Sequence, residues 1–486
     1  MFSFGFFNMP NLITVLFIVN IVIALTIIFL ERKNPSATLA WIMILFLLPI
    51  VGIVFYFLFS QNIARKKIFK LTKYEAEVLG GSLHEQTNSM INGSFEFTNK
   101  ESKKWYDMIR LNQTNALAYF TQNNSISIIT DGKHMFNSLL EDIKNAKETI
   151  NITYYIVKYD SVGRTLIDAL IEKAKEGVEV RLLLDAMGSR QINEKRLQDF
   201  INAGGKAAFF FPPKFKCLNM KLNYRNHRKL VVIDDEVGYL GGFNIANEYL
   251  GKVKKFGYWR DTHLKLTGGC VQDMNARFIL DWRFASKEKL VMAQAYYNEP
   301  KEVGITGIQI VASGPDSPRE EVKQGYLKMI SSAKKNIYIQ SPYFVPDASI
   351  MEALKTAVLC GVDVRIMIPC MPDHMFVYWA TYSYVGILAN LGAKIYIYDN
   401  GFLHAKTMAV DGEVGSIGSA NFDIRSFRLN FEANAFIYDA EEVYKLESIF
   451  EEDMIKSHEL TRSLYRNRPL IVKFKESVSR LLSDLL

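Results

Sequence analysis

Cysteine is scarce in this sequence of 486 residues, and the thiols form no CxxC pair and no Cys/His spacing that would bind zinc. The four cysteines therefore predict a reducing compartment and unpaired, structural thiols; they are Cys217, Cys270, Cys360 and Cys370. A strong charge of either sign is also absent, because the formal net charge is only +7. This charge suits an acidic partner, but a membrane surface and a nucleic acid would both serve. The length allows for about three domains.

Charge is missing altogether from two stretches near the N-terminus, 12–30 and 38–59. At 1.5 Å per residue, helices of these lengths extend roughly 28 Å and roughly 33 Å, enough to cross the hydrocarbon core of a bilayer. A cleaved signal peptide is disfavoured, because MFSFGFFNMPN holds no Lys or Arg and a second span follows directly. Two apolar core helices are the other alternative. Residues 1–60 are therefore predicted to be two transmembrane helices packed as a hairpin, which would satisfy Asn20 and Pro49.

Positive charge flanks the two predicted spans unequally. The loop between them holds Arg32 and Lys33, whereas the segment after the second span holds a denser cluster of Arg65, Lys66, Lys67 and Lys70. Because cytoplasmic flanks are enriched in Lys and Arg, we expect the N-terminus and everything after residue 59 on the cytoplasmic side. Residues 61–115 are predicted to form a basic juxtamembrane helix and a connector.

The rest of the sequence repeats itself. Residues 147–185 match residues 334–369, and each stretch has the pattern of an apolar strand, an amphipathic helix, a glycine and a second strand. Strand, helix and strand in this order predict a βαβ unit and a largely parallel sheet. The predicted fold class is α/β, with two pseudo-twofold-related halves of mostly parallel or mixed sheet, at 116–298 and 299–486.

The C-terminal segment PLIVKFKESVSRLLSDLL is predicted to be an amphipathic helix. We expect it to pack on its own domain rather than on a membrane. Its apolar face would be formed by Phe474, Val478, Leu481, Leu482 and Leu485.

Each half ends with the same motif, NHRKLVVIDDEVGYLGGFN from 226 to 244 and HAKTMAVDGEVGSIGSAN from 404 to 421. Side chains alternate along a strand, so His227 and Lys229 share one face. The second copy places His404 and Lys406 in the same way. Asp234 and Asp411 follow at the end of each strand, where they can fix the turn of a hairpin. Two such copies in two matching halves make a chance occurrence negligible.

Two His/Lys pairs brought together by a pseudo-twofold axis would form a phosphate site. Lys229 and Lys406 would supply positive charge to the nonbridging oxygens, while Asn244, Asn421 and Ser419 would donate hydrogen bonds. One imidazole can attack phosphorus and form a phosphohistidine, while the other protonates the leaving alkoxide and later activates the acceptor. The lysines supply the charge, so no metal and no cofactor is predicted.

A nucleophilic imidazole also needs an acceptor on its far nitrogen, which sets its tautomer. Asp261, in YWRDTH, and Glu432, in LNFEAN, lie downstream of the first and the second His and are the candidates for this role. A solvated or structural carboxylate is the alternative for both. Ser419 stands where the first copy has Gly242, so the two half-sites are not equivalent.

The two HxKxxxxD motifs resemble those of the phospholipase D superfamily. NPSATLAW, NYRNHRKLVVID, YWRDTHLKLTG, GFLHAKTMAVD and GSANFDIRSFRLNFEANAFIYD resemble, more narrowly, the bacterial cardiolipin synthases, and the resemblance covers nearly the whole chain. It implies a multi-pass enzyme of the bacterial cell membrane with its catalytic part in the cytoplasm. One phosphatidylglycerol would donate a phosphatidyl group and another would accept it, with release of glycerol. It also implies that His227 is the nucleophile and His404 the general acid and then base, an order that the residues alone leave open.

Several alternatives remain open. A phosphohistidine can pass its group to water, which would make the protein a hydrolytic phospholipase D. The same residues could cleave a nucleic-acid phosphodiester, although no separate nucleic-acid-binding motif is present, or serve a catalytically dead lipid-binding scaffold. His263 could line the site or be structural, and the aromatic stretch after His374 could be core or line a lipid groove. The oligomeric state is not predicted.

A basic, partly apolar segment at 212–229 is predicted to lie against anionic headgroups beside His227, with a solvated loop as the alternative. Its cations are Lys214, Lys216, Lys221, Arg225 and Arg228. Lys252, Lys254 and Lys255 are expected to contribute to the same surface.

Overall fold

A computed structural model of the chain describes residues 9–30, 35–48, 52, 56, 68–212, 223–290, 303–481 and 483. Its contacts divide the chain into two compact units, of which the first comprises 1–63 with 213–223 and the second 64–212 with 224–486. Several sequence predictions fall outside the described residues. They concern Pro49, the cations at 32–33 and 65–67, the lysines at 214, 216 and 221, and the break near 298–301.

The first unit contains helices α1 (Met9–Leu30) and α2 (Pro35–Leu47), which pack against each other. The Asn20 side-chain amide donates to the Leu45 carbonyl oxygen at 3.0 Å, and the rings of Phe17 and Phe46 meet edge to face at 5.3 Å. The predicted pairing of two helices is thus observed, and the neighbouring helix accepts from the Asn20 amide nitrogen, whereas the Asn20 side-chain oxygen has no partner among the described residues. Within the described residues, no helix combines the length and the apolar character needed to cross a membrane. The predicted second span, 38–59, is described only in part.

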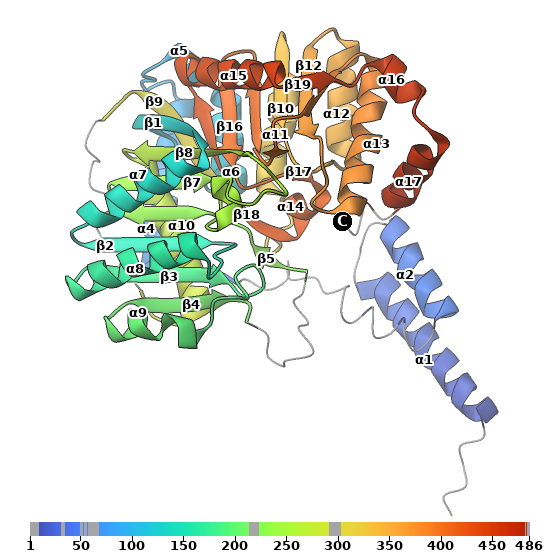
Figure 1. Cartoon of the computed structure of the whole chain (residues 1–486), viewed down its shortest axis with the longest axis horizontal. Helices are drawn as coiled ribbons and strands as arrows, with labels where there is room; N and C mark the ends of the chain where they lie inside the picture. The colour runs from blue at the N-terminus through green and yellow to red at the C-terminus, as the bar shows by residue number, and fades with distance from the viewer. Residues whose placement is uncertain are drawn as a thin grey trace, which may run out of the picture. The chain divides into compact units, whose positions relative to one another are not determined.

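The second unit contains both sequence repeats. Its first half consists of β1 (Thr121–Asp131), α7 (Gly132–Asn145), β2 (Thr149–Tyr154), α8 (Ser161–Lys175), β3 (Glu179–Asp185), α9 (Gln198–Asn202), β4 (Lys206–Phe210), β5 (Arg225–Asn226), β6 (Leu230–Ile233), β7 (Val237–Gly241), β8 (Trp259–Thr267) and α10 (Cys270–Ser286). Figure 1 shows this half beside the second, each with helices against its strands.

The second half repeats this order of elements. It consists of β9 (Thr306–Ser313), α11 (Glu321–Ser332), β10 (Asn336–Gln340), β11 (Phe344–Val345), α12 (Ala348–Leu359), β12 (Asp363–Pro369), α13 (Met375–Leu391), β13 (Lys394–Tyr398), β14 (Phe402–Leu403), β15 (Thr407–Val410), β16 (Val414–Gly418), β17 (Phe422–Asp423), α14 (Ile424–Arg428), β18 (Asn430–Tyr438), α15 (Ala440–Ile455), β19 (Ser457–Glu459), α16 (Arg462–Arg466) and α17 (Leu470–Leu481).

Both halves contain a mixed sheet of the same topology. Strands β2, β3 and β4 are parallel, as are β10, β12 and β13, which is the βαβ unit that the sequence predicts. The strands that carry the His motifs join antiparallel, in the order β2–β6–β7–β8 and β10–β15–β16–β18. The sheets are therefore less parallel than predicted, because the motif hairpins and the strand after them reverse direction.

Among the residues that the structure describes, three strand pairs join the halves. Strand β1 pairs antiparallel with β9, so that the two sheets adjoin. The short strand β5 of the first half pairs parallel with β18 of the second, and β14 of the second half pairs parallel with β8 of the first. Each short strand lies immediately before a motif histidine. The lead-in to each histidine is therefore held by the opposite half.

The segment that precedes the first half is helical over most of its described length. It forms α4 (Lys73–Ile91), α5 (Lys100–Lys104) and α6 (Tyr106–Ala116). Thr72 and Glu75 begin α4 with a reciprocal capping box. Trp105, Met108 and Ile109 are buried in the same hydrophobic cluster as Val322 and Tyr326 of α11. The segment predicted to be a connector thus contributes to the hydrophobic core of the second half.

The C-terminal helix α17 packs on α13, in agreement with the expectation that it rests on its own domain. The face that makes the contact is not the predicted one. Glu476 and Ser479 are buried, whereas Phe474, Val478 and Leu481 are exposed. The apolar face of this helix therefore points away from the protein; Leu482 and Leu485 lie outside the described residues.

Candidate active site

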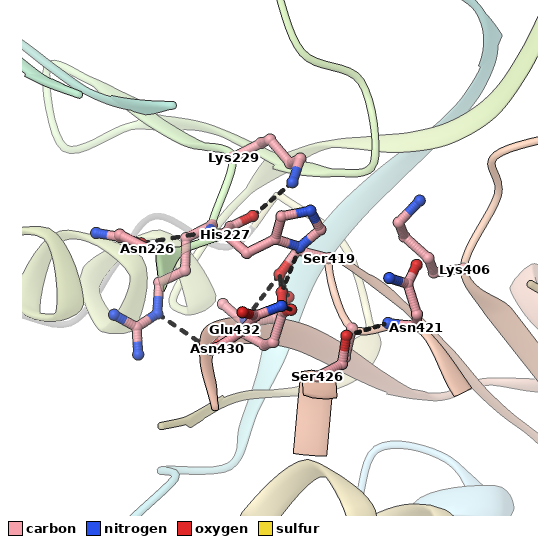
Figure 2. A network of polar contacts seen from close by, with 12 residues as sticks. Asn226, His227, Lys229, Lys406, Ser419, Asn421, Ser426, Asn430 and Glu432 are labelled. Carbon is pink, nitrogen blue, oxygen red and sulfur yellow. Dashed lines mark hydrogen bonds and ion pairs between the residues drawn. The ribbon is translucent and has the colours of Figure 1, made fainter. Parts of the chain in front are cut away.

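His227 lies between β5 and β6 and is nearly buried. Its Nδ1 is 3.0 Å from Oε2 of Glu432 on β18, in the other half. The same carboxylate accepts hydrogen bonds from the Ser419 hydroxyl at 2.5 Å and from the Asn430 amide at 3.1 Å. Figure 2 shows this network, with the His227 ring above the carboxylate. Because an ionised carboxylate only accepts, Nδ1 must carry the hydrogen and Nε2 is left with a free lone pair.

His404, between β14 and β15, is held in the corresponding way. Its Nδ1 is 2.6 Å from Oδ2 of Asp261 on β8, in the first half. The second oxygen of Asp261 accepts from the Thr262 backbone amide at 2.8 Å. The Lys406 amine also lies 2.9 Å from the His404 Nδ1, so a lysine and a carboxylate meet at the same ring nitrogen.

The two carboxylates thus cross between the halves: Glu432 serves the first histidine and Asp261 the second. The strand pairing explains the exchange. The His227 amide donates to the Phe431 carbonyl at 2.9 Å, and the His404 amide donates to the Arg260 carbonyl at 2.7 Å. Each histidine is therefore placed beside the residue before the carboxylate of the other half. The sequence identified both carboxylates as candidates but offered no signal that they would be exchanged.

Both motif lysines are buried, Lys229 at 0% and Lys406 at 1% exposure. The Lys229 amine donates to the carbonyl oxygen of its own His227 at 2.5 Å, and Lys406 donates to that of His404. Burial lowers the pKa of Lys229 to about 7 and that of Lys406 to about 8, and Glu432 and Asp261 oppose this effect. The charge of Lys406 contributes to the lowered pKa of Lys229, so the two ammonium groups act on one shared region.

The imidazoles belong to the same electrostatic site. Burial, together with the positive charges of Lys406 and Lys229, lowers the pKa of His404 to about 4 against the opposing charge of Asp261. Burial also lowers the pKa of His227, with additional effects of Lys229 and Lys406 against Glu432. Each ring thus responds to the lysine of the opposite half. Both histidines are therefore neutral at neutral pH in the free site. The positive charge of the site lies on the two lysines, and a negatively charged ligand would complement it.

The two halves have different residues at one equivalent position, Gly242 in the first half and Ser419 in the second. Ser419 uses its hydroxyl hydrogen on Glu432, so it supports the carboxylate rather than pointing to a ligand as predicted. A Cβ at Gly242 would lie 1.9 Å from Oδ1 of Asp261. Only glycine leaves room there, because a Cβ contact below 3.0 Å forces a neighbour to move. The asymmetry noted in the sequence is therefore a difference in how each carboxylate is held.

The two motif asparagines also differ. The Asn244 oxygen accepts from the Ile156 backbone amide at 3.0 Å, and its side-chain amide contacts the Tyr249 hydroxyl at 3.2 Å. Asn244 is thus engaged within the protein. The Asn421 side-chain oxygen is buried without a hydrogen-bond partner among the described residues. Figure 2 shows the Asn421 side chain next to Lys406, so of the two asparagines Asn421 is the one placed to meet a ligand.

Asp234 and Asp411 are engaged by backbone amides. Asp234 accepts from the amides of Lys147, Glu148 and Thr149, each at 2.8 Å. Asp411 accepts in the same way from the amides of 334–336. Both residues begin the predicted hairpin turns with positive φ, 52° and 58°. Strand β6 separates Asp234 from His227, and β15 separates Asp411 from His404, so these carboxylates hold the strand framework and do not contact the imidazoles.

Aromatic residues that the sequence did not single out line both imidazoles. The Tyr155 ring meets the His227 ring edge to face at 4.8 Å, and the Lys229 amine lies 5.4 Å from the centre of the same ring. Trp259 lies 5.2 Å from the His404 ring. Asn430, which supports Glu432, was also missed. Trp259 and Asn430 each stand two residues before a candidate carboxylate, at positions that face the same side of a strand.

The prediction that 212–229 forms a basic surface is wrong for Arg225 and Arg228, which are buried. Arg228 is 1% exposed and forms a two-bonded ion pair with Asp281, at 2.9 and 2.7 Å. It also donates to the Ser313 carbonyl of the other half, and Arg225 is buried as well. Arg228 therefore joins the halves instead of meeting a headgroup. Lys252, Lys254 and Lys255 are exposed, as a surface role requires.

The remaining histidines fall into two groups. His84, His134, His374 and His458 lie at the surface, with exposed side chains. His263 is fully buried, and neither ring nitrogen has a hydrogen-bond partner among the described residues. Burial lowers the pKa of His263 to about 3, so it is a neutral core residue next to Tyr239 and Phe243.

Comparison with known proteins agrees with this geometry. Residues 139–255 and 326–454 match the family model described as cardiolipin synthase, phospholipase D-like domain, and residues 18–61 match the phospholipase D-nuclease N-terminal model. The chain is 50% identical over 476 residues to the major cardiolipin synthase ClsA of Bacillus subtilis, covering 98% of this chain and 99% of the relative. It is also 50% identical over 470 residues to the cardiolipin synthase of Oceanobacillus iheyensis, covering 97% and 98%.

Among solved structures, the phosphatidylserine synthase of Haemophilus influenzae is similar to the chain with a TM-score of 0.61. The match covers 78% of this chain and all of that structure, at 17% identity. At this level of identity the similarity extends to the fold alone.

Proposed function

The chain belongs to the cardiolipin synthases of the phospholipase D superfamily, and we propose how its two crossed half-sites carry out the reaction. The enzyme is a phosphatidyltransferase: it moves a phosphatidyl group from one phosphatidylglycerol to another, producing cardiolipin and glycerol. The observation that carries the proposed mechanism is the pair of buried histidines, each with Nδ1 held by a carboxylate of the other half and Nε2 left for chemistry.

In the first step, Nε2 of His227 attacks the phosphorus of the donor lipid. The bond between phosphorus and the headgroup glycerol oxygen breaks, and His404 gives that oxygen a proton, so that glycerol leaves. In the second step, a glycerol hydroxyl of the acceptor lipid returns a proton to His404 and attacks phosphorus. The bond between His227 and phosphorus then breaks, which releases cardiolipin and restores both imidazoles.

The lysines and the substrate supply each other's charge. In the free site the two buried ammonium groups hold the pKa of His404 at about 4, after the larger effect of burial. A phosphodiester anion between Lys229 and Lys406 would offset their charge, and would thereby raise the pKa of His404 toward the value that a general acid needs. The same anion would restore the protonated state of both lysines. Lys229 and Lys406 are therefore assigned to binding the nonbridging oxygens. The side-chain amide nitrogen of Asn421 is assigned to donate to them, because its side-chain oxygen can only accept.

The carboxylates act through the histidines. Glu432 and Asp261 fix the Nδ1–H tautomer and stabilise the positive charge that develops on each ring. Ser419 positions Glu432, and Asn244 supports the loop around Tyr249. We assign Asp234 and Asp411 to the framework rather than to the reacting atoms, because their oxygens are engaged by backbone amides.

A membrane location is part of the proposal. The substrate is a lipid, and the N-terminal helix α1 exposes apolar side chains within its own unit, among them Val15, Phe17, Ile18, Val22 and Leu25. We propose that α1 and α2 form a membrane hairpin of the bacterial cell membrane, with the catalytic unit on the cytoplasmic side, as the unequal positive flanks favour. Such an anchor would let phosphatidylglycerol enter the site from the bilayer.

The experiment that tests the function supplies purified full-length protein with phosphatidylglycerol labelled in its headgroup glycerol and in its acyl chains. Cardiolipin and free glycerol in equal amounts support the transfer. Phosphatidic acid as the main product would indicate hydrolysis by water instead. A His227→Ala and a His404→Ala variant serve as controls, and full activity of either variant would contradict the two-histidine mechanism.

A further inference from the structure

Helix α17 presents its apolar side to solvent. At 3.6 residues per turn, five exposed apolar side chains fall within an arc of about 100°. They are Leu470, Ile471, Phe474, Val478 and Leu481. An exposed apolar stripe of this kind on an otherwise well-packed protein marks a surface that another partner covers.

The orientation of α17 is set by buried polar contacts. Glu476, which is 3% exposed, accepts hydrogen bonds from Arg468 at 2.6 and 2.7 Å and from the Tyr465 hydroxyl at 3.1 Å. Turning the apolar stripe inward would break this buried ion pair. Removing one partner of such a pair is strongly unfavourable, so the outward stripe is a built feature of the fold.

Cations stand on both sides of the stripe. Lys475 lies along one edge, and Lys473 and Arg480 lie along the other, as the helical positions require. From 461 to 483 the sequence holds six basic residues and one acid, Glu476, which is buried. An apolar stripe bordered by Lys and Arg is complementary to an anionic phospholipid surface, where the apolar side chains enter the acyl region and the cations meet the headgroups.

The stripe is linked to the active site through α13, on which α17 packs. Helix α17 runs along α13 in the same direction, with Lys475 5.0 Å over the Trp379 ring and Arg480 5.4 Å over the Tyr384 ring. The first turn of α13 exposes Met375 and Phe376. Just before this turn, Asp373 bonds to Tyr343, and its negative charge partly offsets the effect of burial on the pKa of Lys406.

We propose that α17, together with the exposed first turn of α13, docks on the surface of an anionic phospholipid bilayer and holds the mouth of the active site against the lipid. The proposal rests on the lipid-transfer function for the identity of the partner. The docking is interfacial, with α17 lying in the plane of the surface and its apolar stripe inserted by about 5–10 Å. A second copy of the chain covering the same stripe is the competing occupant.

The direct test places a tryptophan in the stripe of the full-length protein in phosphatidylglycerol/phosphatidylcholine vesicles. The fluorescence of the introduced tryptophan is the difference between the emission of the Phe474→Trp variant and that of the parent protein. We expect brominated acyl chains to quench this difference about twofold, because the stripe enters the acyl boundary. Tyr444→Trp on α15 is the matched control, since Tyr444 is 69% exposed and Phe474 66%. Equal quenching of the two variants would overturn the proposal. Protection of the introduced indole that depends on protein concentration and not on lipid would overturn it as well.

A second test separates docking from chemistry. Leu481→Asp should lower the rate on phosphatidylglycerol in vesicles about tenfold, because a charge in the stripe opposes insertion. The rate on phosphatidylglycerol dispersed in detergent micelles should not change. Ile455→Asp is the matched control, because Ile455 and Leu481 are 86% and 85% exposed. Equal losses in vesicles and micelles would contradict docking. No activity of the parent protein in either vesicles or micelles would contradict the proposed function, and the quenching result would then decide the docking by itself.

Discussion

The two half-sites share a plan but differ in how each carboxylate is held. Glu432 faces His227 and accepts from three side chains, those of His227, Ser419 and Asn430. Asp261 faces His404 and accepts from that ring and one backbone amide. Where the second half places the Ser419 hydroxyl, the first half has Gly242, whose missing side chain makes room for Asp261. The longer carboxylate is thus fixed by extra donors and the shorter one by close packing.

The comparison of the half-sites also shows that neither half can form a complete site by itself. Each histidine depends on the carboxylate of the opposite half, so neither half alone holds an oriented imidazole. The repeated chemistry is also not redundant, since the environments of the two rings differ while both tautomers are set alike. Two related half-sites can therefore perform two different steps of one reaction.

Replacing either imidazole is expected to cause the largest loss of activity. We expect His227→Asn and His404→Asn each to lower the turnover of phosphatidylglycerol by about 10³-fold or more. A donor with a p-nitrophenol headgroup distinguishes the two, because its leaving group needs no proton. His404→Asn should release one equivalent of p-nitrophenol and then stall, whereas His227→Asn should release none. The opposite pattern would exchange the roles of the two histidines.

Removing the charge of each carboxylate tests the exchange between halves. Glu432→Gln and Asp261→Asn should each lower turnover by about 10²-fold, because the imidazole loses the partner that sets its tautomer. Glu432→Gln should slow the p-nitrophenol burst, which depends on His227. Asp261→Asn should leave the burst and slow the later turnover, which depends on His404. If the two variants showed the same defect, the crossed assignment would be wrong.

The difference at Gly242 and Ser419 predicts unequal costs for the same small side chain. Gly242→Ala places a Cβ against Asp261, and such overpacking costs about 1–3 kcal/mol of stability. Because Asp261 must shift away from His404 to relieve the contact, we expect turnover to fall about tenfold, which corresponds to about 1.4 kcal/mol in the barrier. Ser419→Ala removes one of three donors to Glu432 and should lower turnover less. Steady-state rates of both variants at equal protein concentration check this order, and a larger loss for Ser419→Ala would contradict it.

The lowered pKa values of the lysines predict a limit at alkaline pH. Burial brings the pKa of Lys229 to about 7 and that of Lys406 to about 8, so both lose their charge as the pH rises through this range. We expect kcat/KM, which reports the free enzyme, to fall across the same range, because neutral amines no longer attract the phosphodiester. Lys229→Arg should remove the lower of the two transitions, since a guanidinium stays protonated. An unchanged alkaline limb would assign it to another group.

The smallest effect on the chemistry is expected at Asp234 and Asp411. Asp234→Asn keeps a residue that tolerates positive φ but weakens the hydrogen bonds to three backbone amides. We expect a loss of about 1–3 kcal/mol in the free energy of unfolding and little change in the turnover of folded protein. Denaturant unfolding and active-site titration of the same sample measure both quantities. A large loss of turnover without a loss of stability would return Asp234 to the catalytic set.

The sequence predicted the parts of this protein that depend on local pattern. The doubled motif, the βαβ repeat and the hairpin turns at Asp234 and Asp411 follow from residue spacing and alternation, which neighbouring residues decide. The pairing of two N-terminal helices through Asn20 was predicted in the same way. The antiparallel share of each sheet was underestimated, because the motif hairpins reverse the chain within the sheet.

What only the tertiary structure decided are the pairings between distant segments. Which carboxylate meets which histidine depends on β5 joining β18 and β14 joining β8, pairs whose members lie far apart in the sequence. The burial of Arg228 against Asp281 and the outward stripe of α17 likewise depend on partners in other elements. Side-chain types determine what chemistry is possible, but long-range backbone pairing determines which groups share a site, because a hydrogen-bonded strand register is set by both strands together.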